Sequence, residues 1–274
     1  MESPTAILKR YGLRPKKSWG QCFLHDPATV RKIVEHADIG ESDTVVEIGA
    51  GLGTLTGELA GVAGHVVAIE RDRDLAEVLR REFAGNSKVE VAEENALTFD
   101  FSALQGPVTV VGNLPYNISS PLLFHLISNW RWITTATIMM QKEVVNRLVA
   151  RQGTRAYGIP SVICRQFADV NACFRVSRRA FVPVPGVDSA VVRLVMRAEP
   201  LFPCDQDVFR DVVHAAFRAR RKTLKNALEL TYPTVLIRSA LAAAGIDGRR
   251  RGETLTVEEY ATLARCLAEL GTQG

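Results

Sequence analysis

Two short segments of the chain carry residues whose types and spacing fit a chemical task. The first, residues 47–53 (EIGAGLG), follows an apolar run that predicts a buried strand. Its glycines, Gly49 and Gly51 among them, allow a tight turn and a close approach of the backbone to a ligand. A second predicted strand ends at Glu70, about 20 residues on, where a carboxylate accepts hydrogen bonds from both hydroxyls of a ribose. These features fit a dinucleotide or S-adenosylmethionine (SAM). The spacing E-x-G-x-G-x-G, unlike the G-x-G-x-x-G of pyrophosphate-binding loops, favours SAM.

The second segment is Asn113-Leu114-Pro115-Tyr116, at the end of another predicted strand. The exocyclic amine of adenine is a poor nucleophile because its lone pair is delocalised into the ring, and two acceptors aimed at its hydrogens localise that pair. The Asn113 side-chain oxygen and the Leu114 carbonyl are the candidate acceptors, Pro115 stiffens the loop, and the Tyr116 ring offers a stacking face. This chemistry indicates in-line methyl transfer from a sulfonium, a reaction governed by positioning.

Alternating strand and helix patterns must position these two segments. The predicted strands are residues 44–48, 65–70, 88–92, 108–112, 136–140, 161–167 and 189–196. Between the first of these and the N-terminus, residues 27–37 form an amphipathic helix capped by Asp26. This order predicts an α/β fold with a mostly parallel sheet and helices on both faces. Ligands of such sheets bind at the carboxyl ends of the strands, so the two segments are expected to face each other.

After Met196 the pattern changes to helices alone. Residues 197–207 contain two prolines and predict a connection, residues 235–244 form a helix that ends at Gly245, and residues 256–259 (TVEE) form a capping box that opens a last helix. The chain therefore divides into residues 1–198, with a basic arm at 1–26, and a small helical domain at 199–274.

Composition and charge limit the class of protein. With 47% hydrophobic and 23% charged residues, the chain can bury a core. No run reaches the ~18 apolar residues of a membrane span, and no signal peptide is visible. Five cysteines without a CxxC pair argue against a disulfide framework and against zinc, so we expect no metal and a cytoplasmic location. The net charge is +4, and many Lys and Arg residues gather in basic clusters, which suggests a polyanion partner.

One basic cluster has helical spacing. Arg218, Arg221, Lys222 and Lys225 lie at i, i+3, i+4 and i+7, which places them on one face of a single helix beside an apolar stripe. Such a row of cations predicts salt-dependent binding to phosphates. The N-terminal arm either closes over the cofactor pocket or touches RNA, and the sequence leaves both open.

At this point the sequence resembles the KsgA-type ribosomal RNA adenine dimethylases, which place two methyl groups on N6 of adenine. The segments that carry the resemblance span nearly the whole chain: residues 20–24 (GQCFL), 47–53, 112–119 (GNLPYNIS), 141–148 (QKEVVNRL), 181–189 (FVPVPGVDS) and 217–224 (FRARRKTL). The resemblance implies a Rossmann-like seven-stranded SAM-dependent methyltransferase domain with a C-terminal all-helical RNA-binding domain.

The resemblance also implies roles for individual residues. SAM contacts are expected at Cys22, Leu24, Gly49, Gly51, Glu70, Asn95 and Asn113. Phe181 is expected to pack on the target base opposite Tyr116. The implied substrate is a pair of adjacent adenines in a hairpin loop near the 3′ end of small-subunit (16S) rRNA, met in the pre-30S particle during ribosome biogenesis. We expect the enzyme to act as a monomer.

Two positions depart from the family's pattern. The family usually has Asn where Cys22 stands and Asp where Asn95 stands, so SAM is expected to bind with reduced affinity. Two other interpretations stay open. One is the related Erm class, which methylates large-subunit rRNA, although the basic segment at 217–224 and the full helical tail favour the first. The other is a ribosome-assembly or RNA-binding factor with weakened catalysis, which the two departures suggest and the Asn113–Tyr116 segment opposes.

Overall fold

The computed structural model describes residues 2–16, 19–116 and 118–271. Positions 17–18 of the basic arm, and Asn117 within the segment 112–119, therefore lie outside the described residues. The chain forms two compact units, residues 1–145 with 169–196, and residues 146–168 with 197–274. The second unit includes residues 146–168, a segment that the sequence-based boundary near residue 200 assigns to the first domain.

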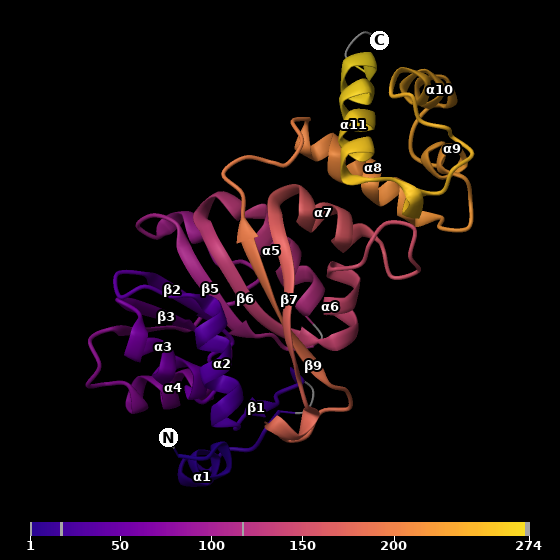
Figure 1. Cartoon of the computed structure of the whole chain (residues 1–274). Coiled ribbons are helices and arrows are strands. Elements are labelled where there is room, and N and C mark those ends of the chain that lie inside the picture. Colours follow the sequence, from indigo (N-terminus) through magenta and orange to yellow (C-terminus); the bar gives the residue numbers. More distant parts are fainter. Residues whose placement is uncertain (1, 17–18, 117, 272–274) are drawn as a thin grey trace. The chain divides into compact units, whose positions relative to one another are not determined.

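The first unit is built on a seven-stranded mixed sheet, as expected (Figure 1). Its order is β4-β3-β2-β5-β6-β9-β7, and the strands are β2 (Thr44–Ile48), β3 (His65–Ile69), β4 (Val89–Ala92), β5 (Val108–Asn113), β6 (Ile133–Gln141), β7 (Ala168–Val176) and β9 (Ser189–Met196). β2 runs parallel to both β3 and β5, and β5 runs parallel to β6. β9 is antiparallel to β6, with Gln141 opposite Ser189. A two-stranded sheet pairs β1 (Phe23–Leu24) with β8 (Phe181–Val182).

Helices cover the sheet because its strands are apolar on both faces. Those of the first unit are α1 (Pro4–Arg10), α2 (Pro27–Ala37), α3 (Thr54–Val62), α4 (Arg73–Glu82) and α5 (Ser119–Ser128), while α6 (Lys142–Leu148) continues into the second unit. Ile33 of α2 and Leu59 of α3 pack against Val45, Val111 and Met139 of the sheet. Asp26 caps α2 as predicted, since its side chain accepts a hydrogen bond from the Thr29 amide at 3.0 Å.

The predicted strand at residues 161–167 is wrong, because this segment is the helix α7 (Ile159–Phe167). Pro160 occupies its first turn, and the Ser161 hydroxyl accepts a hydrogen bond from the Gly158 amide, so the start of the helix is locally specified. Its apolar run, which indicated a buried strand, is instead a broad buried helix face. The seventh strand is β7, at the edge of the sheet, where mostly exposed and half-buried side chains leave no clear alternation.

Among the described residues beyond 200, the second unit contains helices and no strands, as predicted. Besides α7 it contains α8 (Gln206–Arg218), α9 (Leu224–Leu228), α10 (Thr234–Ala243) and α11 (Val257–Gly271). The rings of Tyr157, Phe217 and Tyr260 form its aromatic centre. The capping box is confirmed: the Thr256 amide donates to the Glu259 carboxylate at 2.8 Å, and the Glu259 amide donates to the Thr256 hydroxyl at 3.0 Å. Within the described residues, no helix is both long and apolar enough to cross a membrane.

Candidate active site

The glycine-rich loop joins β2 to α3 and folds over the end of β3. The Gly49 and Ala50 amides donate to the Ile69 carbonyl at 2.9 and 3.1 Å. Gly53 is the N-cap of α3 with φ of 80°, and a Cβ there would lie 2.5 Å from the Phe83 ring. Glycine is thus required at this turn by both the backbone conformation and the available space. The loop leaves its backbone open toward a cavity at the carboxyl edge of the sheet.

Glu70 follows β3 and is held by the backbone around it. Its two carboxylate oxygens accept hydrogen bonds from the Gly51 amide at 2.9 Å and the Asp72 amide at 2.8 Å. Burial raises the pKa of Glu70 above its ordinary value, against the effect of these two amides. The carboxylate is therefore fixed in position beside the glycine loop.

The segment 113–116 lies at the end of β5, next to β2, and several hydrogen bonds fix it. The Leu114 amide donates to the Met139 carbonyl of β6 at 3.0 Å, and the Asn113 side-chain amide donates to the Cys22 carbonyl at 3.4 Å. The Ser119 hydroxyl, at the start of α5, donates to the Pro115 carbonyl at 3.0 Å. The Asn113 contact engages the nitrogen of its side chain, which orients the oxygen as the acceptor.

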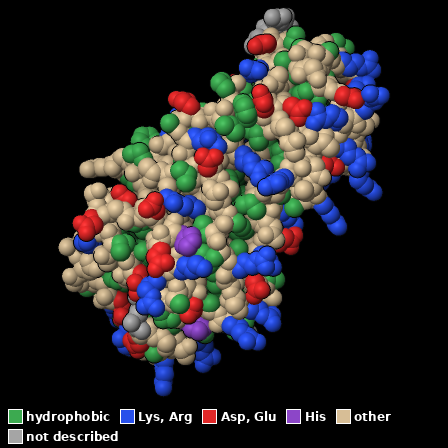
Figure 2. All heavy atoms as spheres, in the orientation of Figure 1, with side chains coloured by type: hydrophobic (Ala, Val, Ile, Leu, Met, Phe, Trp, Pro, Cys, Tyr) green, Lys and Arg blue, Asp and Glu red, His purple; other side chains and the backbone are tan. Residues whose placement is uncertain are grey.

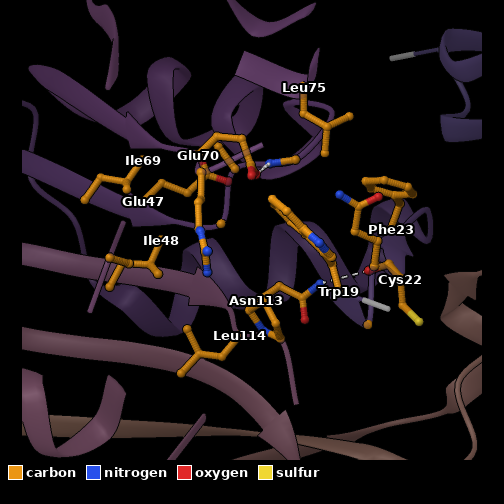
Figure 3. A pocket seen from close by; sticks show the side chains of 18 of the residues that line it. Trp19, Cys22, Phe23, Glu47, Ile48, Ile69, Glu70, Leu75, Asn113 and Leu114 are labelled. Atoms are coloured by element: carbon orange, nitrogen blue, oxygen red, sulfur yellow. Dashed lines mark hydrogen bonds between the residues drawn. The ribbon is translucent and has the colours of Figure 1, made fainter. Parts of the chain in front are cut away.

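A single cavity of about 330 Å³ brings together every residue predicted for cofactor binding or catalysis (Figure 3). These lining residues are Cys22, Leu24, Gly49, Gly51, Glu70, Asn95, Asn113, Leu114, Pro115, Tyr116 and Phe181. Phe181, in β8, is 1% exposed and also belongs to the core of the first unit. The Asn95 side-chain oxygen accepts a hydrogen bond from the Leu97 amide at 3.1 Å. The glycine loop and the 113–116 segment thus face each other across one space.

The sequence prediction missed a second buried carboxyl in this cavity. Glu47, in β2, is 1% exposed, and its Oε2 has no hydrogen-bond partner among the described residues. Burial, and to a lesser degree the nearby charge of Glu70, raise the pKa of Glu47 to about 8. An acid inside an otherwise apolar strand was the visible signal for this residue. With Glu70, it gives the cavity two buried carboxyl groups.

Part of the described N-terminal arm lies at this cavity. Lys16 donates to the carboxylates of Asp72 and Asp74 at 2.6 and 2.8 Å, and residues 19–24 line the cavity. Trp19, a lining residue that the sequence reasoning did not select, is 39% exposed, and the Arg71 guanidinium lies 5.2 Å from its ring centroid. Of the two roles left open for the arm, these contacts favour the one at the cofactor pocket.

The prediction of one helix carrying Arg218, Arg221, Lys222 and Lys225 on a single face is wrong. α8 ends at Arg218, and α9 begins only at Leu224, after a turn in which the Lys222 amide donates to the Ala219 carbonyl. Two local interactions account for the break. The Thr223 hydroxyl caps α9 by accepting from the Asn226 amide, and the Arg220 side chain donates to the carbonyls of Arg155 and Tyr157.

The four basic residues nevertheless stay close in the chain, on the turn and the two helix ends around it. Arg218, Arg221 and Lys222 are exposed, while Lys225 is half-buried and lies 3.7 Å from the Glu229 carboxylate. Figure 2 shows Lys and Arg side chains gathered along the side of the helical unit where α9 and α10 lie. Among the residues that the structure describes, no group of His, Cys, Asp and Glu side chains is arranged to hold a metal ion.

Comparisons with known proteins agree on the class of enzyme. Residues 12–269 match the family described as ribosomal RNA adenine dimethylase. Two bacterial proteins named ribosomal RNA small subunit methyltransferase A are similar: that of Moorella thermoacetica is 44% identical, over 96% of each chain, and that of Myxococcus xanthus is 43% identical, over 98% of this chain and 97% of the relative.

Two solved structures are also similar over most of the chain. A dimethyladenosine transferase from Plasmodium falciparum superposes with a TM-score of 0.77 at 29% identity, covering 92% of this chain and 98% of the other. The 23S rRNA methyltransferase ErmE superposes with a TM-score of 0.69 at 31% identity, covering 90% of this chain and 99% of the other.

Proposed function

Since the chain belongs to the ribosomal RNA adenine dimethylase family, we propose that it uses SAM to place two methyl groups on N6 of each of two adjacent adenines in small-subunit rRNA. The chain is an rRNA adenine N6,N6-dimethyltransferase. The observation that carries the proposal is the convergence of the glycine loop, Glu70 and the segment 113–116 on one cavity.

The choice of the small subunit rests on the relatives. Those named for the small-subunit RNA are 43–44% identical over nearly the full length, against 31% for the large-subunit enzyme ErmE. The proposed target is the adenine pair in a hairpin loop near the 3′ end of the RNA, in the pre-30S particle of the cytoplasm. Unpaired loop adenines are physically suitable because they can be splayed into a pocket at low cost.

The cavity fits SAM by the chemistry of its polar groups. We infer that Glu70 accepts hydrogen bonds from the ribose hydroxyls and that the Asn95 oxygen accepts one from the adenine amine. The buried, unpartnered Oε2 of Glu47 is a polar atom that a polar group of a bound ligand can satisfy. Cys22, Leu24, Gly49, Gly51 and Asn113 complete the proposed contacts. When bound, SAM supplies a methyl group activated by a positively charged sulfur.

The residues of the 113–116 segment perform the positioning that this reaction needs. The Asn113 side-chain oxygen and the Leu114 carbonyl accept the two hydrogens of the target amine and so direct its lone pair. Tyr116 and Phe181 hold the base between their rings, and Pro115 limits the freedom of the loop. No residue of the chain has to act as a nucleophile, because the amine itself attacks the methyl carbon and the rate depends on its alignment.

The RNA outside the target loop is assigned to the helical unit. We infer that Arg218, Arg221, Lys222 and Lys225 contact phosphates, although they flank a turn rather than forming one helix face. Their contribution is sequence-independent and falls as salt rises. A monomer suffices for this arrangement.

Transfer of a labelled methyl group from SAM to small subunits that lack the modification tests the proposal. We expect the wild-type chain to dimethylate the adenine pair and Asn113→Ala to abolish transfer. Thr137→Val, a buried β6 position, should keep the wild-type rate and serves as the control. Asn113→Ala with wild-type activity would refute the catalytic assignment, and methylation of large-subunit RNA alone would refute the substrate. Parallel assays on naked RNA and assembled particles identify the form used.

A further inference from the structure

Ser189 contacts Tyr116, one of the residues that line the cavity. It is the first residue of β9, directly after the segment 181–188 that begins with Phe181, and it is fully buried. Because β9 runs antiparallel to β6, Ser189 stands opposite Gln141, the last residue of β6. The start of β9 is therefore found at the same edge of the sheet as the carboxyl ends of β5 and β6.

The Ser189 hydroxyl shares a hydrogen bond of 2.7 Å with the phenol of Tyr116. These residues are 73 positions apart in the chain, so the bond ties the Tyr116 side chain to the start of β9. The backbone of the Tyr116 loop is fixed separately, by the Leu114 and Pro115 contacts to Met139 and Ser119. Those contacts leave the Tyr116 side chain free to swing about its Cα–Cβ bond, whereas a bond at the far end of the ring fixes the direction in which the side chain points.

We propose that Ser189 is a positioning residue, which holds the Tyr116 ring at the angle needed to stack on the target adenine; this rests on the proposed function. The Tyr116 side chain is half-buried and lines the cavity, so its phenol can bond water when Ser189 is lost. Removing the Ser189 hydroxyl then costs little stability but releases the ring. A base that follows the released ring moves its amine off the line of transfer.

A double-mutant cycle tests the inference, with Ser189→Ala, Tyr116→Phe and the double variant. Each single variant removes one partner of the bond and keeps the ring itself. We expect each to lower kcat for methyl transfer by about tenfold, since misplacement by about 1 Å can cost ~10²-fold. The double variant should be no slower than the slower single variant, because the two act through one bond. The KM for RNA and the Kd of SAM should change by less than about twofold.

Ser161→Ala provides a matched control for stability. Ser161 is also a fully buried serine with hydrogen bonds, to the Arg147 carbonyl and the Gly158 amide, but it belongs to the second unit and is not among the residues that line the cavity. We expect it to lower the unfolding temperature at least as much as Ser189→Ala while keeping the wild-type kcat. A general loss of stability would reduce activity in both variants alike.

The possible outcomes separate this inference from the proposed function. An inactive wild-type enzyme refutes the function, and the positioning role with it. An active wild type with kcat unchanged in Ser189→Ala, or with losses that multiply in the double variant, refutes the positioning role alone. If Ser189→Ala does not fold, Tyr116→Phe tests the inference by itself. A wild-type kcat in Tyr116→Phe, which lacks the phenol hydroxyl, would show that the bond is dispensable and refute the positioning role.

Discussion

Replacing Glu47 by Gln should make the protein more stable, and increasingly so as the pH rises. Glu47 is 1% exposed at the floor of the cavity, and one of its carboxylate oxygens has no hydrogen-bond partner among the described residues. Burial raises its pKa from 4.5 to about 8. Gln has nearly the same shape but carries no charge at any pH, so the substitution removes the ionisation and little else.

The sign of this pH dependence follows from whether the folded or the unfolded chain keeps the Glu47 proton. Below pH 4.5 the carboxyl is protonated in both the folded and the unfolded chain and contributes nothing to the pH dependence. Between pH 4.5 and 8 the unfolded chain loses the proton while the folded chain keeps it, so wild-type stability falls as pH rises. Each pH unit costs about 1.4 kcal/mol, which gives roughly 3 kcal/mol at pH 7 and about 5 kcal/mol above pH 8.

Urea unfolding of the SAM-free protein at pH 5.5, 6.5 and 7.5 measures this cost. The difference in unfolding free energy between Glu47→Gln and the wild type should grow by about 2–3 kcal/mol across that range. Any hydrogen bond that the amide gains or lacks adds an offset that does not change with pH. Thr137→Val changes a buried side chain that does not titrate, so its difference in unfolding free energy from the wild type should not change with pH. Parallel curves for Glu47→Gln and the wild type would refute the reasoning.

Three further predictions concern the sheet, the cofactor and the RNA. Gly112→Ala should cost about 2 kcal/mol in urea unfolding, because its Cβ would lie 2.8 Å from the Ile48 carbonyl oxygen, whereas Gly61→Ala, in open space on α3, should add about 0.5–1 kcal/mol. Asn95→Asp should tighten SAM binding about fivefold in a calorimetric titration, because a charged acceptor is stronger; absence of SAM binding in the wild type would contradict this. Arg221→Ala should reduce the slope of log affinity against log salt by about 0.7–0.9.

The site was largely predictable because its parts are local in sequence. Each candidate segment directly follows a strand, and parallel strands deliver their carboxyl ends to one edge of the sheet. The glycine loop after β2 and the Asn113 segment after β5 therefore had to meet once β2 and β5 paired. Glu47 was also within reach of the sequence, as a lone acid in an apolar strand. Its burial and missing partner, however, depend on packing that the sequence does not display.

Two element predictions failed where a local interaction overrode the pattern. Residues 162–164 form an apolar run, which strands and buried helices share, and the Ser161 and Pro160 start signals decide for the helix. The basic run from Arg218 to Lys225 has helical spacing, but the Thr223 cap and the anchored Arg220 side chain interrupt it. In both places, interactions of a few residues at a helix end outweighed the pattern of the segment.

The direction of β9 explains why the base site was harder to predict than the cofactor site. Every strand from β2 to β6 ends at the site edge, so its contribution is the loop that follows it in the sequence. β9 runs the other way, and it therefore brings its first residue, Ser189, and the preceding segment with Phe181 to that same edge. A parallel strand in this place would have directed both away from Tyr116. The loops on the cofactor side thus all follow the carboxyl ends of strands. The base side also needs residues at the amino end of a strand, and these reach the site because β9 is antiparallel to β6.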